Sequence, residues 1–172
     1  SEKLSFVLPV ALGHTGRPGS DLERMKLLFD SLSGRIDKHD VGAFLVITRP
    51  QDLEVVSSCI SSTDFGDVTS VISENSICPE LASDPDTFHE FPTRNKGWYR
   101  QQLLKLGAAR HLTGDFYMTL DSDVVFTQPF CARDLISNGR SIVNTQTHSD
   151  FKRLFTDQMA DDSTSVRMWR DL

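Results

Sequence analysis

Two acidic residues, Asp121 and Asp123, follow directly after the apolar run at residues 116–120. Such a run predicts a buried strand, and on an extended backbone two side chains at positions i and i+2 project to the same side. Paired carboxylates at the end of a strand, with room for water, are ligands that Mg²⁺ and Mn²⁺ prefer. The spacing therefore predicts a divalent-metal site at Asp121 and Asp123. The alternative is that the pair only begins the next turn.

A helix predicted over residues 98–112 precedes this strand and carries a lysine on its apolar side. The apolar arc of a helical projection is formed by Trp98, Leu106, Ala109 and Leu112. Gln102 and Lys105 fall inside the arc, whereas Arg100 and Gly107 fall on the opposite side, so Lys105 is expected to point toward the sheet. It either reaches the edge of the apolar face as a solvated group or meets a phosphate or carboxylate.

The start of this helix is a second place that suits an anion. Arg94, Asn95, Lys96 and Gly97 lie just before it, and the first turn of a helix offers free backbone amides and a partial positive charge. We therefore take Trp98, Asn95, Lys96, Gln102 and Lys105 as candidate substrate-binding residues.

The elements that must position these residues alternate along the chain. Strands are predicted at 4–10, 43–48, 68–72 and 116–120, and helices at 20–32, 52–60 and 98–112. This alternation predicts an α/β fold with a mainly parallel sheet and helices on both faces. Residues 73–96 lack a clear period and are expected to form an active-site loop, within which a second acidic pair, Asp84 and Asp86, is interpreted as a turn. Beyond Asp123 we expect an apolar run at 124–126, a strand at 141–144 and a weak helix at 151–159.

Composition limits the possible classes of function. The chain has 172 residues, 38% of them apolar and 24% charged, and a net charge of −6, which fits one globular domain over residues 1–172. No basic cluster is present to bind nucleic acid unaided, and no apolar run is long enough for a transmembrane segment. An anionic ligand would therefore need help from a cation. Cys59, Cys78 and Cys131 form no Cys-x-x-Cys pair and are expected to serve in packing.

The segments GWYRQQLLKL (97–106) and FYMTLDSDVVF (116–126) resemble the nucleotide-diphospho-sugar glycosyltransferases of the A-type fold, and most of all a family of uncharacterised glycosyltransferase-like proteins. In the related glycogenin-like enzymes, a helix with a donor-binding lysine precedes an Asp-x-Asp strand end by the interval seen here between Lys105 and Asp121. The resemblance extends over residues 92–130, more loosely over 4–32, and implies the Rossmann-like, nucleotide-binding half of such an enzyme.

The resemblance implies a metal-dependent glycosyltransferase that transfers a sugar from a nucleotide-diphosphate sugar, with a UDP-sugar as the expected donor, to an unknown acceptor. Asp121 and Asp123 would hold Mn²⁺ or Mg²⁺ against the diphosphate, Lys105 would contact the donor, and the loop at 13–19 would meet the base. Related enzymes take a third metal ligand, often histidine, and their acceptor site from a C-terminal half, which we expect to lie beyond Leu172. His148 is a candidate ligand but fits a surface loop better.

Two other classes of function stay open at the level of sequence. A haloacid-dehalogenase-like phosphatase would use Asp121 as the nucleophile and Asp123 as the general acid. A non-catalytic module would bind a nucleotide or a metal without an acceptor site. The sequence leaves the compartment open between the cytoplasm and the Golgi lumen.

Overall fold

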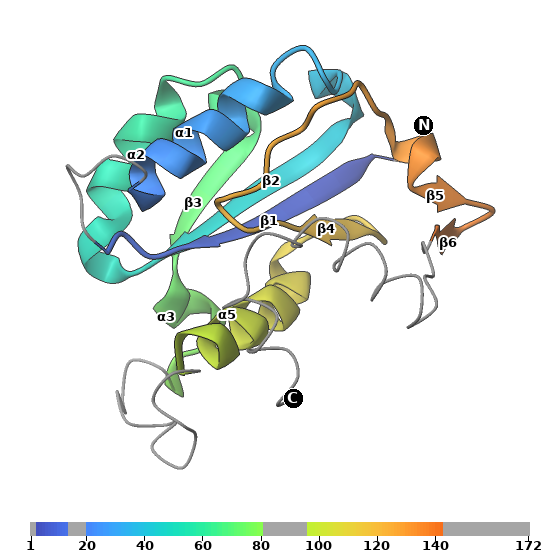
Figure 1. Cartoon of the computed structure of the whole chain (residues 1–172). Helices are drawn as coiled ribbons and strands as arrows, with labels where there is room; N and C mark the ends of the chain where they lie inside the picture. Colours follow the sequence, from blue (N-terminus) through green and yellow to red (C-terminus); the bar gives the residue numbers. More distant parts are fainter. Residues whose placement is uncertain (1–2, 14–19, 81–95, 143–172) are drawn as a thin grey trace, which may run out of the picture.

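A four-stranded parallel sheet lies at the centre of the computed structural model, which describes residues 3–13, 20–80 and 96–142 (Figure 1). The strands are β1 (Leu4–Val10), β2 (Val41–Thr48), β3 (Thr69–Ser73) and β4 (Tyr117–Thr119), in the spatial order β3-β2-β1-β4. The helices are α1 (Asp21–Leu32), α2 (Leu53–Ser61), α3 (Glu74–Ile77) and α5 (Lys96–Gly107). Short 3₁₀ turns lie at Lys38–Asp40, Pro50–Asp52, Gly66–Val68, Ala108–His111 and Ala132–Asp134. The predicted α/β fold is confirmed.

The register brings the ends of three strands to one level. Val10 of β1 pairs with Thr48 of β2, and Thr48 pairs in turn with Ser73 of β3. On the other side of β1, the Leu120 amide donates to the Val7 carbonyl at 2.8 Å, which extends the pairing one residue past β4. After β3 the chain returns across the sheet to place β4 beside β1, and such a reversal of strand order is where ligands bind in open α/β sheets.

Helices cover both faces of the sheet, as predicted (Figure 1). In β1, Phe6 and Leu8 point into the larger core beneath α1 and α2, whereas Val7 points into a smaller core against α5. The alternation follows from the two-residue period of a strand. Helix α1 begins after Ser20, whose side chain accepts a hydrogen bond from the Glu23 amide and caps the helix.

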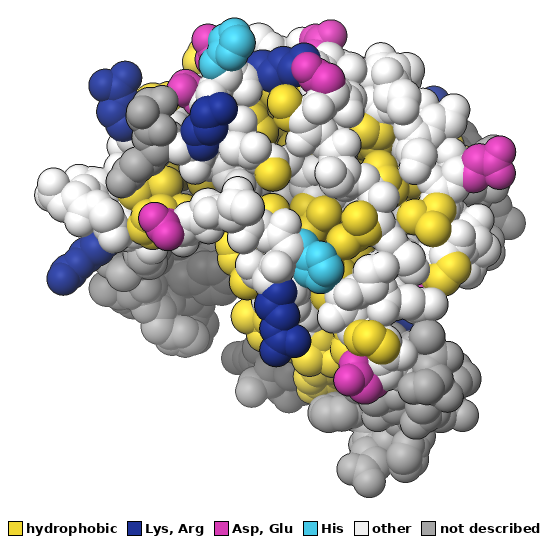
Figure 2. All heavy atoms as spheres, turned by 180° about the vertical axis from the view of Figure 1, so that it is seen from behind, with side chains coloured by type: hydrophobic (Ala, Val, Ile, Leu, Met, Phe, Trp, Pro, Cys, Tyr) yellow, Lys and Arg dark blue, Asp and Glu magenta, His cyan; other side chains and the backbone are white. Residues whose placement is uncertain are grey.

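The buried face of α5 is not the one that the helical projection predicted. Leu104 and Ala108 are buried against the sheet, while Trp98 and Leu106 are 57% and 71% exposed. The projection was wrong because apolar residues lie all around this helix, so its periodicity does not define one face. Figure 2 shows the back of the molecule, where hydrophobic side chains also reach the surface between scattered charged groups.

Gly107, predicted on the solvent side, lies instead where α5 packs on α3. A Cβ atom at this position would lie 2.7 Å from Cγ2 of Ile77. The absence of a side chain at Gly107 therefore allows the close approach of the two helices.

The C-terminal part of the described chain differs from the expectation. Arg140–Ser141 (β6) forms a small antiparallel hairpin with Ile136–Ser137 (β5), and both residues of its turn, Asn138 and Gly139, have positive φ, as a tight hairpin turn requires. Of the strand expected at 141–144, residues 141 and 142 are described and the other two are not. The helix expected at 151–159 also lies outside the described residues.

Two other expectations are resolved in part. The region at 73–96 is not irregular throughout, because it begins with α3; residues 81–95 lie outside the described part, as do Asp84, Asp86 and His148. Two of the cysteines serve in packing, Cys59 against the larger core and Cys78 against the smaller one. Across 3–13, 20–80 and 96–142, no helix has the length and hydropathy needed to span a membrane.

Candidate functional site

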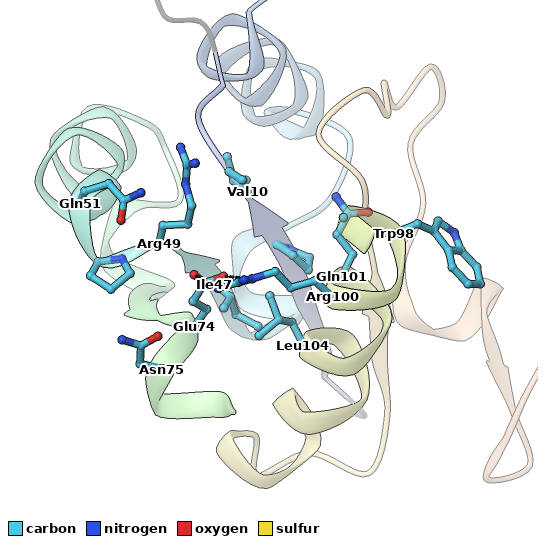
Figure 3. Close-up of a pocket in the computed structure, with 14 residues that line it drawn as sticks. Val10, Ile47, Arg49, Gln51, Glu74, Asn75, Trp98, Arg100, Gln101 and Leu104 are labelled. Atoms are coloured by element: carbon cyan, nitrogen blue, oxygen red, sulfur yellow. Dashed lines mark hydrogen bonds and ion pairs between the residues drawn. The ribbon is translucent and has the colours of Figure 1, made fainter. Parts of the chain in front are cut away.

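The carboxyl ends of β1 and β2, the start of α3 and the first turns of α5 line a pocket of about 710 Å³ (Figure 3). Val10, Ile47 and Leu104 contribute apolar surface. Its polar lining consists of Arg49, Gln51, Glu74, Asn75, Arg100 and Gln101. The volume and the mixture of apolar walls with a few polar groups are typical of a small-molecule or cofactor site.

An ion pair with a buried carboxylate crosses the pocket from α3 to α5. The Arg100 guanidinium donates from Nε to Glu74 Oε2 at 2.9 Å and from Nη2 to Oε1 at 2.6 Å, and Glu74 is only 5% exposed. Glu74 is the first residue of α3, which Ser73 caps through the Asn75 amide. The prediction that Arg100 faces away from the sheet was therefore wrong.

A second ion pair fixes the chain just beyond β1. Asp52 accepts hydrogen bonds from the Leu12 amide at 3.2 Å and from Arg49 Nε at 2.7 Å, and Arg49 also donates to the Leu12 carbonyl. The last residue of β1 that pairs with β2 is Val10. Two residues later, the side chains of Asp52 and Arg49 supply the hydrogen-bond partners of the Leu12 backbone. Asp52, predicted to open α2, makes no side-chain cap on that helix. The pair thus holds the backbone at Leu12, just beyond the end of β1.

Asp121 and Asp123 lie just past the carboxyl end of β4, but not on extended backbone. The strand ends at Thr119, and the Val124 amide donates to the Asp121 carbonyl at 3.2 Å, which closes a turn over residues 121–124. The alternative expectation, that the pair begins a turn, describes the backbone correctly. Both residues are exposed, so their carboxylates are open to solvent at this edge.

Lys105 reaches Asp121 directly. Its ammonium lies 2.7 Å from Asp121 Oδ1, and only 11% of the lysine side chain is exposed, against 53% for the aspartate. The Lys105 carbonyl accepts a hydrogen bond from the Tyr117 hydroxyl at 3.0 Å, so its helix turn is tied to β4. Lys105 thus points toward the sheet, as predicted, because it borders the buried face formed by Leu104 and Ala108.

The other candidate residues do not gather at this place. Trp98 is among the residues that line the pocket, but its ring packs edge-on against Tyr99, with ring centroids 5.1 Å apart, and its indole points away from the other labelled pocket residues (Figure 3). Gln102 is half-buried outside the pocket lining, where its neighbour Gln101 is found instead. Asn95 lies outside the described residues. Lys96 begins α5, but its side chain is outside the described part as well.

The side chains just past the end of β4 include two carboxylates, and carboxylate oxygens are the ligand type that a hard divalent cation prefers. Asp121 already accepts a cation, the Lys105 ammonium, on one carboxylate oxygen, and the exposure of both aspartates leaves room for water and phosphate oxygens as further ligands. Three His, Cys, Asp or Glu side chains do not converge on a metal position anywhere in the described ranges. Asp121 and Asp123 are thus two exposed carboxylates at this edge, of which Asp121 is paired with Lys105.

Sequence reasoning missed the two ion pairs that border the pocket. Arg49 and Asp52 have the i, i+3 spacing that could have suggested a pair. Glu74 and Arg100 are 26 residues apart, and no local pattern connects them.

The strand order and the pocket at the carboxyl edge define an α/β, Rossmann-like protein. The chain belongs to a family described only as "Family of unknown function (DUF6492)", whose sequence pattern matches residues 1–162. No curated protein matches it. Among solved structures, the chain is similar to 4-diphosphocytidyl-2C-methyl-D-erythritol synthase from Anaerococcus prevotii DSM 20548, at 12% identity and a TM-score of 0.41. The match covers 70% of this chain and 43% of that one.

Proposed function

We propose that this chain is the nucleotide-sugar-binding part of a metal-dependent glycosyltransferase, which transfers a sugar from a nucleoside diphosphate sugar to an acceptor. The observation that carries the proposal is the contact between Lys105 and Asp121 at the carboxyl end of β4. It places a cation and an exposed acidic pair on the same edge of the sheet as a pocket large enough for a nucleoside. A nucleoside diphosphate needs positive charge for its phosphates and a pocket for its base. The carboxyl edge of the sheet carries a candidate for each, with Lys105, Asp121 and Asp123 outside the pocket lining.

The pocket is suited to the nucleoside. Val10, Ile47 and Leu104 can pack against a base or ribose, while the amides of Asn75 and Gln101 can exchange hydrogen bonds with a neutral heterocycle. The Arg100 guanidinium is already bound to Glu74 through two hydrogen bonds, so the charges that border the pocket are compensated. The pocket would therefore select for shape and hydrogen bonding rather than for charge.

The acidic pair and the lysine are suited to the diphosphate. Asp121 and Asp123 would hold Mn²⁺ or Mg²⁺, and Lys105 would contact a phosphate oxygen. When bound, the metal ion supplies Lewis-acid stabilisation of the negative charge that develops on the leaving diphosphate. Lys105 adds a second positive charge, carried by a turn of α5 that the Tyr117 hydroxyl ties to β4 through the Lys105 carbonyl. The acceptor and the stereochemical course are left open.

The test is calorimetric titration of the chain with uridine, guanosine and cytidine diphosphate sugars, each in Mn²⁺ and in a chelator. We expect one base class, uridine first, to bind in Mn²⁺ and to bind at least tenfold more weakly in the chelator. Undiminished binding in the chelator would overturn the metal-bridged scheme. Phosphate release from a model phosphate ester would instead favour the phosphatase, and donor binding without transfer to water or any added acceptor would favour the non-catalytic module.

A further inference from the structure

The Lys105 ammonium is bound to the carboxylate that the proposed metal site would use. It lies 2.7 Å from Asp121 Oδ1, on the protein side of a carboxylate that is otherwise open to solvent. A divalent cation that coordinates Asp121 would come within a few ångströms of this ammonium, because both would contact the same small group. Two like charges at that separation repel each other strongly in a partly buried site.

We propose that Lys105 and the divalent cation compete for Asp121, and that the diphosphate of the donor relieves this competition by accepting the displaced ammonium. The inference rests on the proposed function, since it takes Asp121 as a metal ligand. Its consequence is thermodynamic coupling: the metal binds weakly without a diphosphate, the diphosphate binds weakly without the metal, and each raises the affinity for the other by the same factor.

The local structure allows the ammonium to move while the helix stays in place. The Lys105 carbonyl is fixed to β4 by the Tyr117 hydroxyl, and the neighbouring Leu104 is buried in the smaller core. Only the flexible four-carbon side chain has to change its rotamer, and an ammonium exchanges one oxygen partner for another more readily than a bidentate guanidinium does. Arg100 is unsuited to this exchange because Glu74 holds it through two hydrogen bonds.

The primary experiment measures Mn²⁺ binding to the chain alone, from the loss of the paramagnetic resonance signal of free Mn²⁺. Lys105→Met removes the competing charge and keeps most of the side chain, so it should bind Mn²⁺ about tenfold more tightly than the wild type, the change expected for one lost competing contact. Lys105→Arg keeps the charge and should bind no more tightly than the wild type. Lys26→Met, an exposed lysine on α1 at the opposite face of the sheet, controls for the change in net charge and should match the wild type.

A second measurement uses the wild-type chain, so the test stands even if Lys105→Met fails to fold. Acetylation of lysines, followed by mass spectrometry, reports how accessible each amine is. Addition of Mn²⁺ should accelerate the modification of Lys105 severalfold relative to Lys26, and further addition of uridine diphosphate should slow it again.

The outcomes separate this inference from the function on which it rests. If neither the wild type nor Lys105→Met binds Mn²⁺ at millimolar concentration, the metal site fails and the exchange fails with it. If both bind Mn²⁺ equally and acetylation of Lys105 does not respond to the metal, the exchange is overturned while the metal site stands.

Discussion

At the scale of single residues, two ion pairs at the same edge of the sheet differ in how deeply they are buried. Asp121 is half exposed, so water can solvate its charge if Lys105 is lost. Glu74 is 5% exposed, and it would keep its charge in a poorly solvated place if Arg100 were lost. Loss of the pair between Lys105 and Asp121 is therefore expected to affect ligand binding more than folding stability. Loss of the pair between Arg100 and Glu74 is expected to lower the stability of the fold.

The Lys105→Met variant tests the first half of this contrast. Urea denaturation should show a change of less than about 1 kcal/mol in the free energy of unfolding, because the aspartate left behind is hydrated. Its affinity for a nucleotide sugar in Mn²⁺ should fall about ten- to a hundredfold, as expected for one lost charge-assisted hydrogen bond of roughly 1.5–3 kcal/mol. A loss of stability well above 2 kcal/mol would instead make Lys105 a structural partner of Asp121.

The Arg100→Met variant tests the second half. It should lower the free energy of unfolding by about 2–4 kcal/mol, since it leaves a buried carboxylate without its partner. The double variant with Glu74→Gln should lose less than the sum of the two single changes, because the residues interact directly. Arg140→Met removes an exposed arginine from β6 and serves as the matched control. Equal stabilities of the Arg100 and Arg140 variants in urea would refute this account of the pair.

At the scale of elements, the position of α5 over β1 and β4 decides where Lys105 can reach. The helix packs against α3 at Gly107, where a Cβ atom would meet Ile77, and contacts the sheet through Leu104 and Ala108. Because Lys105 lies between these contacts, a shift of the helix would move its ammonium away from Asp121. The close approach at Gly107 is thus part of what positions the site.

Two glycines of α5 provide a matched pair of substitutions. Gly107→Ala should destabilise the protein by about 1–3 kcal/mol, because the new methyl group overlaps the buried Ile77. Gly97→Ala adds the same methyl group in open space near the start of the helix and should be neutral or stabilising by up to about 1 kcal/mol. Thermal or urea unfolding measures both, and the cost at Gly107 should shrink in an Ile77→Ala background. A Gly107→Ala protein as stable as the Gly97→Ala protein would show that α5 has room to adjust.

The sequence predicted the features that local patterns determine and missed those that depend on contacts between distant residues. The strand at 4–10 and the helix that begins after Ser20 were found because a local apolar period and a cap define them. The buried face of α5 was missed because leucines surround the helix, and only contact with Val7 and Ile77 decides which of them is covered. The pair of Glu74 and Arg100 depends on tertiary structure alone.

In the candidate site, too, some features could be predicted from local sequence and others could not. The sequence indicated that Lys105 faces the sheet near the acidic pair, and the ion pair with Asp121 agrees with that expectation. The proposed common side of Asp121 and Asp123 relied on extended backbone, which the turn at 121–124 replaces. Turn formation there depends on where the pairing of β4 with β1 stops, which composition does not determine.

At the scale of the whole molecule, a pocket, a lysine and an acidic pair lie along the carboxyl edge of one parallel sheet. The chain carries a net charge of −6, so a diphosphate that approaches it is repelled unless a cation intervenes. Membership of a family without an assigned function leaves the chemistry of this edge as the basis for the proposal. The proposed function therefore depends first on a divalent metal at Asp121 and Asp123.

The most direct test is a Mn²⁺ titration of the wild type and of Asp123→Asn, with Asp115→Asn as the control. Asp115 is an exposed aspartate on the amino-terminal side of β4, so its loss makes the same change in charge away from the pair. The account predicts that Asp123→Asn weakens Mn²⁺ binding by at least about tenfold, the loss of roughly 1.4 kcal/mol, while Asp115→Asn binds like the wild type. Equal Mn²⁺ affinities for the wild type and Asp123→Asn would contradict it.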